Sequence, residues 1–89
     1  MLIGTVVGSI VSTQKDEKLI GYKLLIVKRL NANGDICQDL DMVAVDFAGA
    51  GIGDKVLLSS GSSARYLADN PQAPIDLAIV GIIDHLKTD

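Results

Sequence analysis

The chain has 89 residues, of which 48% are hydrophobic and 21% are charged, and its formal net charge at pH 7 is −3. This length suits one domain with one core, so residues 1–89 are expected to form a single domain. Proteins that bind nucleic acids usually present a basic face, often with aromatic side chains that stack on bases. In this sequence the eight lysine and arginine residues and the few aromatic residues are scattered along an acidic chain, which argues against a nucleic-acid partner.

The N-terminal segment and the cysteine content bear on the compartment. No segment approaches the roughly 20 consecutive apolar residues of a membrane-spanning helix, so no membrane partner is expected. Met1–Gly4 has no basic residue ahead of its apolar run, which is not typical of a secretory signal. The single cysteine, Cys37, excludes an internal disulfide framework and suits a reducing environment. We therefore expect a cytoplasmic protein.

Most of the chain is predicted to be β-strand. Valine, isoleucine and threonine are frequent in the apolar segments, and polar or glycine-containing turns separate these segments. A polar turn is expected at residues 14–18, and Asn33-Gly34 gives a second turn, because this dipeptide accepts positive φ angles. The five expected strands are Leu2–Thr13, Lys23–Leu30, Met42–Ala48, Lys55–Ser60 and Ile75–Leu86.

One short helix is expected between the fourth and fifth strands. Ser62 or Ser63 can cap its N-terminus, because a serine hydroxyl accepts a free backbone N–H, and the helix would run to about Ala68. Asn70-Pro71 follows, and the residue before a proline is disfavoured in the α region. Five strands with one short helix in this order predict an all-β protein that forms a small closed barrel.

Two of the strands are apolar on both of their faces. Leu24–Val27 and Leu77–Ile83 show no polar face, whereas a half-exposed antiparallel strand should alternate apolar and polar residues. The barrel interior covers one face, and the sequence offers no helical layer for the other. A domain of this size buries only about 60–65% of the surface of its unfolded chain. We therefore expect a neighbouring subunit to cover the second face.

The segment between the third and fourth strands is rich in glycine, with Gly49, Gly51 and Gly53 alternating before Asp54 and Lys55. It lacks the spacing of a phosphate-binding P-loop, since Lys55 is followed by a valine and a strand rather than by a helix. It also lacks the dinucleotide-binding fingerprint, because the third glycine comes one residue early and no βαβ unit surrounds it. The loop is better interpreted as a place where backbones pack closely, against a copy of the same chain.

The turn Gly61–Arg65 is a second candidate site. Ser62, Ser63 and the guanidinium of Arg65 could bind an anion together with helix N–H groups. The simpler interpretation, a capped helix whose arginine pairs with a carboxylate, is preferred. A serine nucleophile needs a base that a third group orients, and the only histidine, His85, lies near the C-terminus. We therefore predict no catalytic residue, no metal site and no cofactor.

Several segments resemble the EutN/CcmL family, the pentameric vertex proteins of bacterial microcompartment shells. The combination of a Gly-Ala-Gly-x-Gly-acid loop and a Gly-Ser-Ser-Ala-Arg turn is highly specific. The family usually has glutamate at the acid position, where this chain has Asp54. The matching segments are Val6–Gly8, Val11–Lys15, Leu19–Leu25, Val43–Asp46, Gly49–Asp54, Val56–Leu58, Gly61–Arg65 and Ile75–Asp84.

The resemblance implies a five-stranded, OB-like closed barrel that forms a cyclic homopentamer. Such pentamers close the vertices of a polyhedral shell in the cytoplasm, beside hexameric or trimeric shell proteins, and act through shape and contact rather than as enzymes. The family's pentamers have a narrow axial pore, and we expect it near Gly49, Ala50, Gly51, Ile52, Gly53 and Asp54. The candidate residues of the subunit interface are Asp46, Ser62, Ser63 and Arg65.

Arg65 is expected either to join subunits or to pin the glycine loop, in both cases through Asp46 or Asp54. Many family members continue past the last strand with another turn and strand, whereas this chain ends at 87–89. That ending, together with Ser12–Lys15, resembles the vertex proteins of propanediol-type or glycyl-radical-type compartments more than those of carboxysomes. Two alternatives stay open at this point. One is an OB-type oligonucleotide-binding module, and the other is a small anion-binding domain that uses the Gly61–Arg65 turn.

Overall fold

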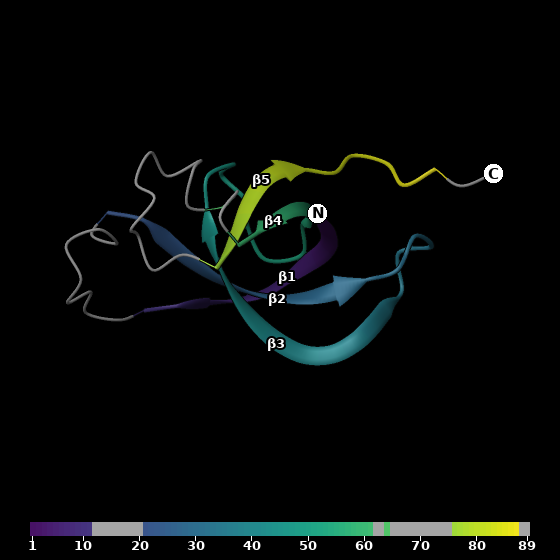
Figure 1. Cartoon of the computed structure of the whole chain (residues 1–89), viewed down its shortest axis with the longest axis horizontal. Coiled ribbons are helices and arrows are strands. Elements are labelled where there is room, and N and C mark those ends of the chain that lie inside the picture. The colour runs from purple at the N-terminus through teal and green to yellow at the C-terminus, as the bar shows by residue number, and fades with distance from the viewer. Residues whose placement is uncertain (12–20, 62–63, 65–75, 88–89) are drawn as a thin grey trace.

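A computed structural model describes residues 1–11, 21–61, 64 and 76–87 of the chain. Its regular elements are five strands that close into one barrel, in the order β1-β2-β3-β5-β4 (Figure 1). This confirms the prediction of an all-β, five-stranded closed barrel. The strands are β1 Leu2–Ile10, β2 Lys23–Leu30, β3 Ile36–Asp46, β4 Lys55–Ser60 and β5 Leu77–Ile82.

Four of the five strand contacts are antiparallel, and the contact that closes the barrel between β3 and β5 is parallel. This parallel contact is short, because it joins only Val45 to Ala78 and Asp46 to Ile79. A parallel pair needs a long crossover connection, and here the path from β3 to β5 runs through the glycine-rich loop and β4. The long β3 strand curves around one side of the barrel and ends at the closure point (Figure 1).

The barrel is filled by the inward-facing residues of all five strands. They alternate with outward-facing residues, as the period of two along a strand requires. Gly4 faces this core, and a Cβ atom there would lie 2.9 Å from Cδ1 of Leu58, so a side chain at this position would displace a buried leucine. The buried core cluster consists of Val6, Leu25, Val27, Ala44, Ala50, Val56, Leu58, Leu77 and Ile79.

The predicted limits of β2 and β4 are confirmed, and those of the other strands differ. The structure begins β3 at Ile36 rather than Met42, because β2–β3 pairing continues through two irregularities to Leu30 opposite Ile36. It ends β5 at Ile82 rather than Leu86, since its partner β4 begins at Lys55 and the last bond runs from Ile83 N–H to Lys55 O (2.8 Å). Strand β1 ends at Ile10 rather than Thr13.

The turn between β2 and β3 is confirmed. Asn31 Oδ1 accepts hydrogen bonds from the N–H groups of Asn33 and Asp35, and Gly34 has a φ of 86°. The turn predicted at residues 14–18 and the helix from Ser62 or Ser63 to about Ala68 lie outside the described residues, apart from Ala64. The Ala64 N–H donates to Gly61 O over 3.1 Å. No helix among the described residues has the length and apolar character to cross a bilayer.

A second apolar cluster lies on the outer face of the barrel, where β3 meets β5. Its buried members are Val45, Ala64 and Ala78. Tyr22 and Phe47 pack against them, with ring centroids 5.2 Å apart in an edge-to-face arrangement. Another subunit was expected to cover the outer face of β5, and this expectation is wrong at Ala78, because residues of the same chain bury it.

Candidate functional site

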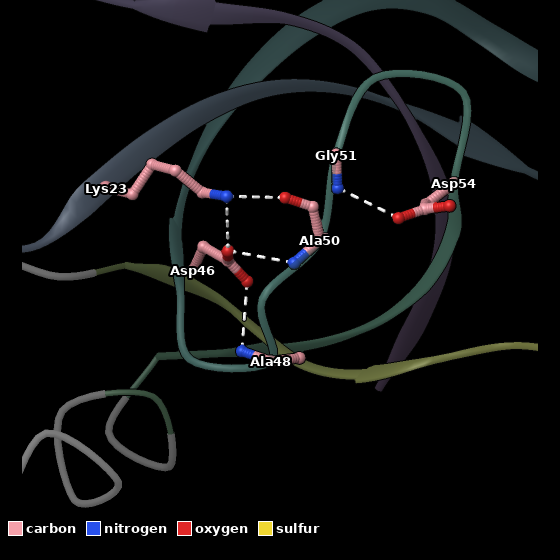
Figure 2. Close-up of polar contacts among 6 residues, drawn as sticks. All are labelled: Lys23, Asp46, Ala48, Ala50, Gly51 and Asp54. Atoms are coloured by element: carbon pink, nitrogen blue, oxygen red, sulfur yellow. Dashed lines mark hydrogen bonds and ion pairs between the residues drawn. The ribbon is translucent and has the colours of Figure 1, made fainter.

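The candidate site is the glycine loop that joins β3 to β4, and the last residue of β3 holds its first half. The carboxylate of Asp46 accepts a hydrogen bond from the Ala48 N–H through Oδ1 (3.0 Å) and from the Ala50 N–H through Oδ2 (3.0 Å) (Figure 2). Only 2% of the Asp46 side chain is exposed. Aspartate commonly bonds to backbone groups two residues ahead in turns, and in this loop it also bonds four residues ahead. One buried carboxylate thus fixes the course of residues 46–50.

Lys23, at the start of β2, completes this contact from the neighbouring strand. Its Nζ lies 3.2 Å from Asp46 Oδ2 and donates to the Ala50 carbonyl oxygen over 2.6 Å (Figure 2). Lys23 reaches both groups because it lies directly opposite Asp46 in the β2–β3 ladder. The lysine therefore neutralises the buried carboxylate and binds the loop backbone at the same time.

The second half of the loop is a tight turn from Gly51 to Asp54. The Asp54 N–H donates to Gly51 O (3.1 Å), and the Asp54 carboxylate accepts from the Gly51 N–H (2.8 Å), so the two residues bond in both directions. Gly53 has a φ of 94°, and a positive φ at the third position of a turn is the reason for glycine there. Ile52 lies at the tip of this turn and is 70% exposed.

The loop is also tied to β1 and to the core. Val6 N–H donates to Asp54 O (2.9 Å), Gly53 N–H donates to Val6 O (2.8 Å), and the Thr5 hydroxyl donates to Asp54 O (3.3 Å). Ala50 is 1% exposed and belongs to the core cluster. With a core anchor and backbone bonds to β1, the loop has one defined shape that presents Ile52 and bare backbone to the outside.

The three glycines of the loop differ in why this chain needs them. Gly49 (φ 77°) and Gly53 (φ 94°) have left-handed backbone angles that other residues adopt only at a cost. Gly51 has no such angle, and a Cβ atom there would meet only Asp54 Oδ2, at the ordinary contact distance of 3.9 Å. The fold of the single chain therefore explains Gly49 and Gly53 but does not explain Gly51.

The structure brings together the loop residues from Gly49 to Asp54 with Asp46, all of which the sequence singled out. Ser62, Ser63 and Arg65 lie outside the described residues, so the predicted pairing of Arg65 remains a prediction. Lys23 is the residue that the sequence analysis missed. Its only sequence signal is its place at the start of a strand, since it reaches Asp46 through strand pairing and not through spacing.

The chemistry available at this loop is that of binding and packing. Its polar groups are bonded to one another, and its exposed side chain is apolar. Within residues 1–11, 21–61, 64 and 76–87, no group of three or more His, Cys, Asp or Glu side chains is placed to hold a metal ion. Cys37 is exposed near the start of β3, at the end of that strand away from the loop, and its thiol lies 3.7 Å from the Arg29 carbonyl oxygen.

The loop presents an exposed apolar side chain, Ile52, at the surface of the small closed barrel. Residues 1–84 match the family described as ethanolamine utilisation protein EutN/carboxysome. The chain is 52% identical to the bacterial microcompartment shell vertex protein PduN of Salmonella typhimurium over 90 residues, covering 98% of this chain and 99% of the relative. It is 43% identical to the carboxysome shell vertex protein CcmL of Nostoc sp., covering 100% of this chain and 88% of the relative.

Solved structures agree with this likeness. The GrpN pentameric microcompartment shell protein from Rhodospirillum rubrum superposes with a TM-score of 0.86 at 44% identity, covering 100% of this chain and 99% of that one. CcmL of Gloeobacter violaceus superposes with a TM-score of 0.90 at 38% identity, covering 100% of this chain and 91% of that chain. The chain therefore belongs to the EutN/CcmL family, as its motifs predicted.

Proposed function

We propose that this chain is a structural protein that forms homopentamers at the vertices of a bacterial microcompartment shell. The observation that carries this proposal is the match over nearly the whole chain to proteins named shell vertex proteins, with the barrel fold in common. A heterologous contact whose rotation closes after five copies generates such a ring without any second component. The pentamer would act by its shape and by its contacts with neighbouring shell proteins, and it would catalyse no reaction.

The compartment type is proposed from the relatives. The higher identity to PduN (52%) than to the carboxysomal CcmL of Nostoc sp. (43%) favours a catabolic compartment of the propanediol type over a carboxysome. Hexameric or trimeric shell proteins of the same cytoplasmic compartment would be its neighbours. This proposal is tested by expressing the chain in cells whose propanediol-type shell lacks its own vertex protein. Closed polyhedral shells in electron micrographs are the expected result, and persistently elongated or open shells would contradict it.

The glycine loop is proposed to lie at the fivefold axis, with Gly49, Ala50, Gly51, Ile52, Gly53 and Asp54 near the pore. Gly51 supports this position, because the single chain has room for a side chain there. Crowding of five copies around one axis is a reason for glycine that only the assembly supplies. The exposed side chain of Ile52 would then lie beside its copies, so the pore would be bordered by backbone and by apolar groups.

Replacing Gly51 tests this position. Gly51→Val leaves the loop hydrogen bonds in place, so we expect a folded chain whose pentamers dissociate at a concentration at least about tenfold higher than wild type. Ala32→Val is the matched control, since Ala32 is exposed in the β2–β3 turn, away from the loop. Size-exclusion chromatography with light scattering across a dilution series measures both. Equal dissociation of the Gly51→Val and wild-type pentamers would show that the loop is not at a crowded axis.

Asp46, Ser62, Ser63 and Arg65 were predicted to form the subunit contact, and we retain this for the arginine and the two serines. The Asp46 side chain is 2% exposed and already bound by Lys23, whereas the Asp54 carboxylate accepts from the Gly51 N–H and pairs with no lysine among the described residues. Asp54 is therefore the better partner for an arginine from a neighbouring chain. We expect Arg65→Ala to reduce the pentamer fraction and Arg65→Lys to restore part of it, as measured by native mass spectrometry. An unchanged pentamer fraction in Arg65→Ala would contradict this role.

A further inference from the structure

The outer face of the barrel carries two separate apolar rows, and the first crosses β1, β2 and β3. Gly8 pairs with Ile26, and Ile26 pairs with Val43. These residues face outward, because their strand neighbours Leu25, Val27 and Ala44 are buried in the core. Ile26 is half-buried and Val43 is 50% exposed, so this row, the Val43 row, is a partly uncovered extension of the outer apolar cluster.

The second row crosses from β3 through β2 and β1 to β4. Ile36 pairs with Leu30, Leu30 with Ile3, and Ile3 with Leu57, and Leu30 within this row is buried, with 5% exposed. Ile3 faces outward, since Leu2 packs against the core on one side and Gly4 faces Leu58 on the other. Leu57 likewise lies between two core residues of β4. This row, the Ile3 row, ends in Ile36, which is 53% exposed.

A polar row separates the two apolar rows. Thr5 pairs with Lys28 on one side and with Lys55 on the other, and Lys28 Nζ lies 3.1 Å from Asp41 Oδ1. Along β2, Ile26 and Leu30 lie about 13 Å apart, with Lys28 between them. The uncovered apolar surface of the barrel is therefore divided into two unlike patches by charged side chains.

This division matches what a ring needs. In a heterologous contact each chain uses two different patches at once, one toward each neighbour, whereas a twofold contact uses one self-complementary patch. Interfaces are apolar at the centre and polar at the rim, and the Thr5–Lys28–Asp41 row would supply a rim common to both patches. The second copy is the favoured occupant, because the structural relative GrpN is titled a pentameric shell protein.

We infer that the Val43 row of one chain and the Ile3 row of the next form the two sides of the subunit contact. This inference rests on the proposed pentamer and adds which surfaces join. The Val43 row lies beside the outer cluster of Val45 and Ala78. A neighbouring chain bound there would therefore cover an apolar surface that is continuous with this cluster. The Ile3 row presents Ile36 as its most exposed apolar side chain.

The first test disables each row alone. Val43→Glu and Ile36→Glu each place a charge at a half-exposed position, so the barrel core is untouched. We expect each variant to lose the five-chain species and to run as a folded single chain of 9.4 kDa in native mass spectrometry, with strand content retained in circular dichroism. Val11→Glu is the matched control, because Val11 is 99% exposed and belongs to neither row; it should remain a pentamer.

The second test mixes the two disabled variants. Val43→Glu keeps an intact Ile3 row and Ile36→Glu keeps an intact Val43 row, so one contact can still form between them. Because neither chain can continue the ring, the mixture should yield a species of two chains, one of each kind. An unfolded variant could not produce this species, which makes the result independent of small losses in stability.

Three outcomes would overturn the inference. They are pentamers in either single variant, a mixture that contains only single chains, and a mixture that returns to five chains. If a glutamate variant loses its strand signal, Val43→Thr and Ile36→Thr replace it, and each is expected to raise the dissociation concentration of the pentamer at least about tenfold. A wild-type chain that is itself monomeric would instead contradict the proposed pentamer, so the two failures are distinguishable.

Discussion

The β2–β3 pair of strands contains two lysine–aspartate ion pairs of nearly equal length in very different surroundings. Lys23 Nζ lies 3.2 Å from Asp46 Oδ2, at the end of β3 that pairs with β5. Lys28 Nζ lies 3.1 Å from Asp41 Oδ1, nearer the middle of β3. The Asp46 side chain is 2% exposed, whereas that of Asp41 is 63% exposed. Distance therefore does not distinguish the two pairs, and burial does.

The Lys23–Asp46 pair also binds the backbone of the glycine loop. Asp46 accepts two backbone N–H groups of the glycine loop, and Lys23 donates to a loop carbonyl. Removing Asp46 would leave those backbone groups without a partner, and unsatisfied buried groups are costly. An exposed pair gains little, because water and salt screen it. One pair therefore holds the loop, while the other mainly keeps a polar boundary between two apolar rows.

The largest effect is expected from Asp46→Ala. It removes the acceptor for the Ala48 and Ala50 N–H groups and leaves Lys23 with only the Ala50 carbonyl. We expect the free energy of unfolding to fall by about 2–4 kcal/mol, between the values for charged hydrogen bonds and for a broken buried pair. Urea unfolding at matched protein concentration measures this. A loss below about 1 kcal/mol would mean that the loop keeps its shape without the carboxylate.

A smaller effect is expected from Gly49, which lies in the segment that Asp46 holds. Gly49→Ala forces a side chain into a backbone angle of φ 77°, at a cost of about 1–2 kcal/mol in the free energy of unfolding. Gly49→Asn is the internal control, because asparagine enters the left-handed region more readily than alanine. Urea unfolding should therefore rank asparagine above alanine in stability. The opposite order would show that the loop changes its backbone angles when substituted.

Lys23→Met removes the ammonium group of the lysine but keeps an unbranched apolar side chain of similar length. The Lys23 side chain is 52% exposed and the buried Asp46 carboxylate keeps its two backbone donors, so we expect a loss of about 0.5–1.5 kcal/mol. The upper part of this range exceeds the value of about 0–1 kcal/mol for a surface pair, because Nζ also binds Ala50 O. Thermal unfolding at low and high salt measures it. A loss as large as that of Asp46→Ala would contradict this ranking of the two residues, since it would make the lysine as necessary as the carboxylate.

The smallest effect is expected from Asp41→Asn. With 63% of its side chain exposed, the pair with Lys28 should contribute about 0–1 kcal/mol, and about 1 M salt should reduce the difference from wild type. We therefore expect this variant to keep its loop and to show the smallest shift in unfolding midpoint of the four variants. A destabilisation as large as that of Asp46→Ala would show that burial does not explain the difference in stability between the two ion pairs.

The sequence predicted the barrel and the loop because both depend on local patterns. Apolar runs and the Asn-Gly turn placed β2 and β4, whereas Cys37, Asp39 and Asp41 concealed the first half of β3, which is set by its partner strand. The role of Lys23 could not be predicted, since it lies 23 positions before Asp46 and only the strand register brings them together. The two outer rows are likewise invisible before the register is known.

We propose that five copies of this chain form one closed ring. The mass of the assembly in solution is the decisive measurement. Native mass spectrometry of the wild-type chain, from low to high micromolar concentration, should show one dominant species of five times the 9.4 kDa chain mass. A species that stays at the mass of one chain throughout, or an even-numbered assembly such as a dimer, would contradict the claim.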